Sequence, residues 1–177
     1  LDGIMEKELL ALSEAAHQAN EILGTSSISL HNFPDNRMDS IDLLDVVKKV
    51  EETIKQIQPN IVYTHHAGDV NIDHRLTHEA VITACLPQPG HCVKTLLFFE
   101  TASSTEWQPP GSATTFHANW FVDISKTLAK KIKALQAYAI EIREWPHARS
   151  TKALEYLAHW RGANVGLEAA EAFILGR

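Results

Sequence analysis

The sequence lacks several features that would define a function class at once. It has two cysteines, Cys85 and Cys92, which do not form a CxxC pair and cannot build a disulfide framework. Its apolar runs are short, residues 95–99 for example, and none reaches the roughly 18 residues of a membrane span. Basic residues are outnumbered, with 16 Lys and Arg against 22 Asp and Glu, so the net charge of −6 does not favour a nucleic-acid groove. We therefore expect a cytoplasmic protein with neither a membrane span nor a nucleic-acid partner.

The composition that remains is that of an ordinary globular protein. Hydrophobic residues make up 45% and charged residues 21% of the 177 residues, which excludes a disordered chain, a collagen and a coiled coil. This length predicts a single domain over residues 1–177. Ten histidines are many for a chain of this size, and they indicate where to look for a site.

Helix-like and strand-like patterns alternate along the chain. Apolar spacing predicts helices over residues 5–22, 40–57, 74–85, 126–143 and 150–161. Short apolar or β-rich runs predict strands over residues 26–31, 61–64, 95–100 and 120–124, and residues 169–175 are ambiguous. Because strands that alternate with helices form βαβ units, we expect an α/β, Rossmann-like fold: a mostly parallel sheet with helices on both faces, in a three-layer sandwich. Ligands of such sheets lie outside the carboxyl ends of the strands.

The loop after the second expected strand is the richest in reactive side chains. Residues 64–78 read THHAGDVNIDHRLTH and include His65, His66, Asp69, Asn71, Asp73, His74 and His78. Imidazole nitrogens and carboxylate oxygens are the usual ligands of a catalytic zinc ion, which keeps one position for water. His74 and His78 have the spacing of an HExxH helix, but Arg75 stands where the general-base glutamate would, so that motif is absent. The pair Asp73-His74, at the start of the third expected helix, is the better candidate for a metal ligand and its carboxylate partner.

These residues also have structural interpretations, and from the residues alone the alternatives stay open. Asp73 could cap the helix, His78 could lie on a solvated face, and His65 could be a hydrogen-bonded histidine at the end of a strand. A different metal set would consist of His65, His66, Asp69 and His74.

Residues 63–77 (YTHHAGDVNIDHRLT) resemble the LmbE-like, or PIG-L-like, family of zinc-dependent N-acetyl-sugar deacetylases. Similar segments follow the family's order over most of the chain: 33–39 (FPDNRMD), 99–107 (FETASSTEW), 119–125 (NWFVDIS), 146–150 (PHARS) and 161–173 (RGANVGLEAAEAF). The resemblance implies that His74 is a zinc ligand and that Asp73 and Asn71 stand at catalytic positions. Asn71 replaces the first histidine of the family's HPDH-type motif; it can donate a hydrogen bond to an oxyanion but cannot act as a general acid.

The same resemblance implies contacts with a sugar substrate. The guanidinium of Arg37 suits sugar hydroxyls or a phosphate, although a salt bridge with Asp35 or Asp39 is an equal alternative. His66 and Asp69 are expected to bind the substrate, and one of them, His66 or Asp69, to take over part of the role of the replaced histidine. Residues 100–107, which include Trp107, are expected to line the pocket.

The implied function is hydrolysis of the N-acetyl group of an N-acetylglucosamine-type sugar conjugate by water activated on zinc or another divalent metal. The family's AHPDDE-type motif, which supplies two further ligands and the general base, does not occur in the 177 residues. We therefore expect an N-terminally truncated domain whose first strand–helix unit is missing. The alternative is a non-catalytic sugar-binding or scaffold protein of the same fold. Relatives often form homo-oligomers, so a homo-oligomer is expected.

Overall fold

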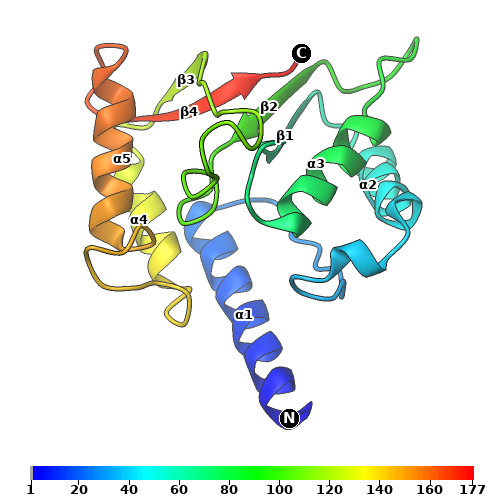
Figure 1. Cartoon of the computed structure of the whole chain (residues 1–177), viewed down its shortest axis with the longest axis horizontal. Coiled ribbons are helices and arrows are strands. Elements are labelled where there is room, and N and C mark those ends of the chain that lie inside the picture. The colour runs from blue at the N-terminus through cyan, green and yellow to red at the C-terminus, as the bar shows by residue number, and fades with distance from the viewer. Residues whose placement is uncertain (1) are drawn as a thin grey trace. The chain divides into compact units, whose positions relative to one another are not determined.

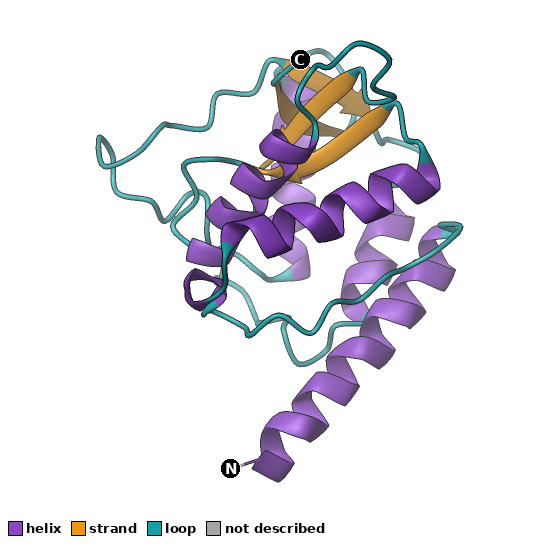
Figure 2. Cartoon of the chain, turned by 90° about the vertical axis from the view of Figure 1, so that its right-hand side faces the viewer, coloured by secondary structure: helices purple, strands orange, loops and turns teal. Residues whose placement is uncertain are grey.

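The computed structural model describes residues 2–177, with side chains from residue 7 onward. Figure 2 shows its helices in purple and its strands in orange. The helices are α1 (Asp2–Leu23), α2 (Leu43–Ile57), α3 (Ile72–Ala84), α4 (Leu128–Gln136), α5 (Thr151–Ala163) and the 3-10 turn η1 (Met38–Ser40). The strands are β1 (Ile61–His65), β2 (Thr95–Phe99), β3 (Trp120–Asp123) and β4 (Ala170–Leu175). Within this part of the chain, no helix is both long and apolar enough to cross a bilayer.

The chain folds as two compact units. Unit 1 consists of Leu1–Asn32 and Val122–Glu171, and unit 2 of Phe33–Phe121 and Ala172–Arg177. The single domain expected for residues 1–177 stays a prediction.

Unit 1 is built on helix packing. The small residues Ala15, Ala16 and Ala19 are buried on α1, and α1 packs along α4, which in turn packs along α5. Ser150 caps α5, as its hydroxyl accepts a hydrogen bond from the Ala153 amide. The helix expected over residues 126–143 is too long: α4 ends at Gln136, and the turns that follow are fastened by an ion pair between Arg149 and Glu141.

The sheet is mixed, and the expectation of a mostly parallel sheet is wrong. Its strand order is β1-β2-β4-β3. β1 and β2 are parallel, with Ile61 opposite Thr95 and His65 opposite Phe99, whereas β2 and β4 are antiparallel. An apolar run has the same side-chain pattern in either direction, so the sequence could not reveal that β4 runs against its neighbour. The three-layer sandwich would include elements of both units, and it stays a prediction.

The strand expected over residues 26–31 is also wrong. These residues form no strand and are mostly exposed. A β-rich run becomes a strand only when a neighbour accepts its backbone hydrogen bonds, and no described strand pairs with it. The ambiguous tail at 169–175 does become a strand, β4, because β2 provides that neighbour.

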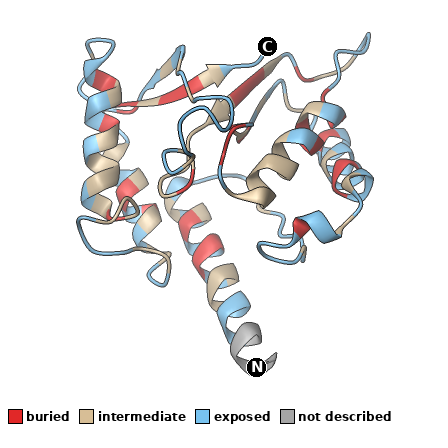
Figure 3. Cartoon of the chain, in the orientation of Figure 1, coloured by how far each residue is buried: buried red, intermediate tan, exposed pale blue. Residues whose placement is uncertain are grey.

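The core of unit 2 lies where α2 and α3 pack side by side and where α3 lies against β1 (Figure 1). Buried residues on α2 and α3 include Val46, Val47, Ile54, Ala80, Val81 and Ala84, and Leu96 of β2 joins the same cluster. Figure 3 shows buried segments of both helices in red. Arg177 fastens the end of the chain to this core by donating to the carbonyls of Cys85 and Val93. The core therefore holds β1 and β2 in parallel, with their carboxyl ends side by side.

Candidate functional site

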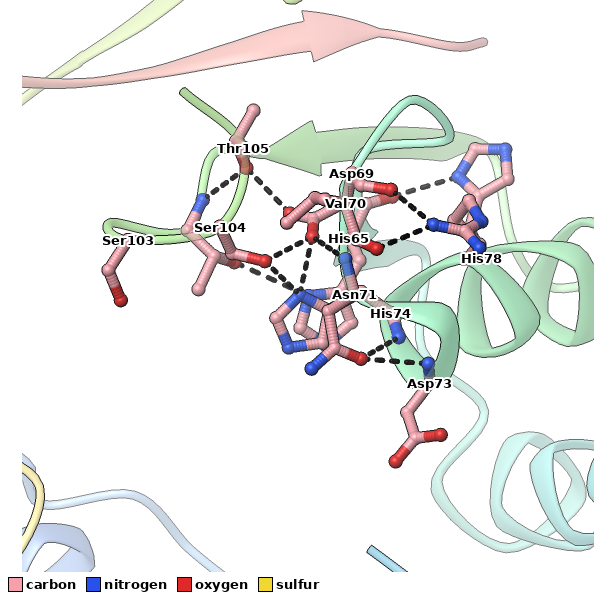
Figure 4. Close-up of polar contacts among 12 residues, drawn as sticks. His65, Asp69, Val70, Asn71, Asp73, His74, His78, Ser103, Ser104 and Thr105 are labelled. Carbon is pink, nitrogen blue, oxygen red and sulfur yellow. Dashed lines mark hydrogen bonds and ion pairs between the residues drawn. The ribbon is translucent and has the colours of Figure 1, made fainter. Parts of the chain in front are cut away.

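The site forms in unit 2, where β1 and β2 end. His65, the last residue of β1, is opposite Phe99, the last residue of β2, so the loops that follow the two strands start as neighbours. Figure 4 shows that side chains from both loops converge on Asp69 and His74. This is the edge at which ligands of parallel strands are expected.

Asp69 is a fully buried carboxylate at the centre of this cluster, with none of its surface exposed. Its Oδ1 accepts from the Asn71 amide at 2.9 Å and from the Ser104 hydroxyl, and its Oδ2 accepts from the Thr105 hydroxyl at 2.7 Å. Burial alone would raise the pKa of the Asp69 carboxyl, but hydrogen bonds from His74, Ser104, Asn71 and Thr105 together hold this pKa well below its usual range. Asp69 is therefore a stable buried anion.

His74 lies in the first turn of α3 and points its Nδ1 at that anion. Nδ1 is 3.1 Å from Asp69 Oδ1, and the His74 ring stacks on the His65 ring with 4.0 Å between centroids and 7° between planes. A carboxylate without a proton only accepts, so Nδ1 carries the hydrogen and Nε2 carries the lone pair. A histidine that donates to a carboxylate through one nitrogen and presents the other is typical of metal ligands and of general bases. The carboxylate partner of His74 is Asp69, not its neighbour Asp73.

Asp73 instead fastens the turn that carries Arg37. Its Oδ2 accepts from the Asn36 amide at 2.6 Å and its Oδ1 from the Met38 amide at 3.0 Å, so it holds both neighbours of Arg37. The N-cap of α3 is Asn71, whose Oδ1 accepts from the amides of Asp73 and His74 at 2.8 and 3.3 Å. The interpretation of Asp73 as the helix cap is thus wrong.

Asn71 belongs to the same cluster, whereas Arg37 and His66 lie in other surroundings. Asn71 donates one amide hydrogen to Asn36 Oδ1 at 3.1 Å, which leaves its second amide hydrogen for another acceptor. Arg37 is exposed on its turn. His66 is buried, with its Nε2 2.8 Å from the Thr114 carbonyl oxygen and its ring against Phe116, so it fastens the 101–119 loop. The structure therefore brings Asp69, Asn71 and His74 together and places Arg37 and His66 in other contacts.

His78 does not lie on a solvated face. It is half-buried, its Nδ1 is 2.8 Å from the His65 carbonyl oxygen, and its ring packs edge-on against Phe98. The interpretation of His65 as a hydrogen-bonded histidine at the strand end fits its contacts, since its Nδ1 lies 3.4 Å from the Thr101 hydroxyl. Burial, followed by the charge of His74, lowers the pKa of His65 to about 4.

Sequence reasoning did not single out Ser104 and Thr105. Both belong to the TASST run at residues 101–105, one residue after the end of β2. The available indication was their position, because a polar loop after one parallel strand lies beside the loop after its neighbour. Only the structure shows that their hydroxyls are directed at Asp69.

The donor set does not make a complete metal centre. His74 alone has the geometry of a ligand, and no group of three His, Cys, Asp or Glu side chains able to hold an ion occurs among the described residues. The alternative set of His65, His66, Asp69 and His74 does not converge, because His66 bonds Thr114 and both oxygens of Asp69 are engaged. A zinc site needs at least three protein ligands, and His74 is the one that the described residues supply with a suitable geometry.

Solved structures of other proteins share this fold. A conserved protein from Thermus thermophilus is 20% identical, with a TM-score of 0.73 over 93% of this chain and 72% of its own. GalB, the 4-carboxy-2-hydroxymuconate hydratase from Pseudomonas putida, is 22% identical, with a TM-score of 0.70 over 94% of this chain and 71% of its own. The N,N'-diacetylchitobiose deacetylase from Pyrococcus horikoshii is 16% identical, with a TM-score of 0.70 over 94% of this chain and 63% of its own. At these identities the similarity shows the fold alone.

A family model matches the first part of the sequence. No curated protein sequence matches the chain. Residues 6–85 match the PIG-L family, described as GlcNAc-PI de-N-acetylase, and this segment includes Asp69, Asp73 and His74. Residues 6–85 are therefore similar to the PIG-L family, as the resemblance predicted.

Proposed function

We propose that the protein is a hydrolase of the deacetylase type, which removes the N-acetyl group from an N-acetylglucosamine-type sugar conjugate. The family match over residues 6–85 and the fold shared with a chitobiose deacetylase support this activity. The observation that carries the proposal is the Asp69–His74 pair at the carboxyl ends of β1 and β2, with 3.1 Å between the carboxylate and Nδ1. Neither the family nor the deacetylase fold favours the alternative of a non-catalytic scaffold.

The chain's own residues divide the work of amide hydrolysis. His74 presents the lone pair of Nε2, as the metal ligand that this chain supplies, while Asp69 accepts from Nδ1 and so keeps the hydrogen on that nitrogen. Asn71 uses its second amide hydrogen to stabilise the oxyanion, which is the role expected at its position. Zinc, or another divalent metal, is the proposed cofactor.

The other expected residues act on the substrate or its surroundings. Arg37 binds sugar hydroxyls or a phosphate from its exposed turn. Asp73 contributes by holding that turn through the amides of Asn36 and Met38. His66 shapes the pocket wall by fastening the loop at Thr114.

The test is release of acetate from N,N'-diacetylchitobiose and from N-acetylglucosamine conjugates, measured with the full chain in EDTA and after addition of Zn²⁺. We expect acetate release that depends on Zn²⁺ and is lost in His74→Ala. The matched control is His17→Ala, an exposed histidine on α1, which should retain the activity. Equal turnover by His74→Ala and the control, or saturable sugar binding without turnover at any metal concentration, would refute the proposal.

A further inference from the structure

Two hydroxyl groups from the loop after β2 reach the buried carboxylate that orients His74. Ser104 donates to Asp69 Oδ1 and Thr105 to Asp69 Oδ2, the latter at 2.7 Å. We propose that Ser104 and Thr105 are positioning residues, which fix the His74 imidazole with its hydrogen on Nδ1 by fixing the Asp69 carboxylate. The inference deepens the proposed function, because it assigns what makes Nε2 of His74 the available nitrogen.

The direction of the Thr105 hydroxyl is determined by its neighbours. Thr105 Oγ1 accepts from the Thr101 amide at 2.7 Å, so one of its lone pairs is used. Its single hydrogen then has Asp69 Oδ2 as its acceptor. The chain of bonds from Thr101 through Thr105 to Asp69 starts at a rigid backbone amide, and consecutive hydrogen bonds polarise one another. Asp69 Oδ2 is thereby held in one orientation.

Ser104 completes the arrangement on the other carboxylate oxygen. Oδ1 accepts from the Ser104 hydroxyl and from the Asn71 amide, and it lies 3.1 Å from His74 Nδ1. Ser104 Oγ also lies 3.4 Å from His74 Nδ1, so it borders the bond that it supports. With its hydrogen donated to Asp69, Ser104 offers only lone pairs towards the imidazole. Asp69 Oδ1 and Ser104 Oγ, the two oxygens close to His74 Nδ1, can therefore only accept a hydrogen bond from it.

Burial gives these hydroxyls their effect. Asp69 has no exposed surface, so bulk water does not replace a missing donor without a rearrangement. A His74 tautomer with a bare Nδ1 would direct a lone pair at Asp69 Oδ1, and the two acceptors would repel. Once a hydroxyl is removed, the carboxylate turns towards its remaining donors, and the preference of His74 for a hydrogen on Nδ1 weakens.

The experiment measures the His74 tautomer by NMR of the ring nitrogens, in the ¹⁵N-labelled full chain without added metal. We expect Nδ1–H in the wild type and a fall of about tenfold in the ratio of Nδ1–H to Nε2–H in Thr105→Val, since a hydrogen bond to a charged group is lost. Thr105→Ser restores the hydroxyl and should restore the wild-type ratio. Thr83→Val is the matched control, because Thr83 is exposed on α3 and its hydroxyl bonds only the Glu79 carbonyl of its own helix.

Ser104→Ala provides a second variant if Thr105→Val does not fold, and it should shift the same ratio. Wild-type His74 signals in the folded hydroxyl-free variants would overturn the inference. The tautomer measurement and the acetate assay can fail independently of each other. A tautomer shift without acetate release from any variant keeps the positioning role and refutes the deacetylase. Where acetate is released, Thr105→Val should lower kcat and leave KM unchanged, because the hydroxyl does not touch the substrate.

Discussion

At the scale of single residues, Asp69 carries the largest expected effect on stability. Asp69→Ala removes the acceptor of the hydrogen bonds from Asn71, Ser104, Thr105 and His74 and leaves buried donors unpaired. We expect the free energy of unfolding to fall by about 3–5 kcal/mol, as for a broken buried charge pair. Urea denaturation measures the change. Asp45→Ala is the control, because its exposed contact with Lys48 at 4.0 Å contributes little, and an equal loss in both variants would contradict the prediction.

His65 should make the folded state less stable as the pH falls below neutral. Its folded pKa is lowered from 6.5 to about 4, first by burial and then by the charge of His74, so the folded state resists protonation. The stabilisation is fully present above pH 6.5 and is lost as the pH falls towards the folded pKa. Between pH 7 and 5 we expect a loss of about 1–2 kcal/mol, reduced because the ring is only half-buried.

The measurement is the free energy of unfolding at both pH values, for the wild type and for His65→Phe, without added metal. Phenylalanine keeps the ring that stacks on His74 but cannot take up a proton. The pH dependence should be smaller in this variant. The same slope in both proteins would show that His65 is not its source.

The sequence indicated which loop gathers reactive side chains, but it did not reveal which of these side chains bond to each other. The density of histidine and carboxylate residues between positions 64 and 78 predicted a loop whose side chains do gather, and Asp69 and His74 contact each other there. Adjacency in sequence suggested Asp73 as the partner of His74, but successive residues in a helix point about 100° apart. Asp69 reaches His74 because the loop folds back, and no local pattern encodes that return.

At the scale of elements, Asp73 connects α3 to the turn before α2. Its carboxylate receives the amides of Asn36 and Met38, and Asn36 has a left-handed φ of 53°. In Asp73→Asn one oxygen becomes an amino group that faces a backbone N–H, so the turn should detach. We expect a loss of about 1–3 kcal/mol and faster amide exchange at residues 36–38, measured by hydrogen exchange. Asp39→Asn, on the same turn and exposed, is the control, and unchanged exchange in Asp73→Asn would refute this role.

Gly68 fixes how closely the loops after β1 and β2 approach each other. A Cβ at this position would lie 1.9 Å from the Thr114 carbonyl oxygen and 2.8 Å from His66 Nε2. Gly68→Ala must therefore displace backbone and break the bond between His66 and Thr114. We expect a loss of more than about 2 kcal/mol, with Phe116 freed from the His66 ring, as urea denaturation and NMR of the aromatic rings would show.

Gly90→Ala is the comparison for Gly68, because a Cβ there meets nothing within 4 Å although its φ is +84°. That variant carries only the backbone strain of about 1 kcal/mol. Equal losses at the two positions would show that the close approach to Thr114 is unimportant.

The helices could be predicted from local spacing, whereas the expected strand over residues 26–31 could not be judged from its own residues. The apolar spacing that places Val46, Val47 and Ile54 on one face of α2 is a property of the segment itself. Residues 26–31 have a suitable composition for a strand, but their state depends on a partner elsewhere in the chain. Helix ends were less exact: α3 begins at Ile72 because Asn71 caps it, two residues before the expected start.

At the scale of the whole molecule, the direction of strands was beyond the sequence. The α/β class followed from the alternation of patterns, and the shared fold of the three solved structures agrees with it. The antiparallel β4 follows from where the chain returns after α5, which composition does not record. The loops after β1 and β2 still lie side by side, because that depends only on the parallel pair β1 and β2.

The expected homo-oligomer stays a prediction, and the edge of the sheet indicates where association would start. β1 is at the end of the strand order in the described part of the chain, and its side chains Ile61 and Tyr63 are 44% and 50% exposed. An edge strand without lysine or proline is a template for pairing with another chain. We expect concentration-dependent association in analytical ultracentrifugation, weakened at least about tenfold by Ile61→Lys, since a charge at a strand edge opposes pairing.

Leu86→Lys is the matched control for this edge. Leu86 is 49% exposed, as exposed as the β1 side chains, but it lies in the loop after α3 and presents no strand edge. If association depends on the β1 edge, this variant should associate like the wild type. If both lysine variants weaken association equally, general surface hydrophobicity drives it. If the wild type remains monomeric at every concentration, the expectation of a homo-oligomer is wrong for this chain.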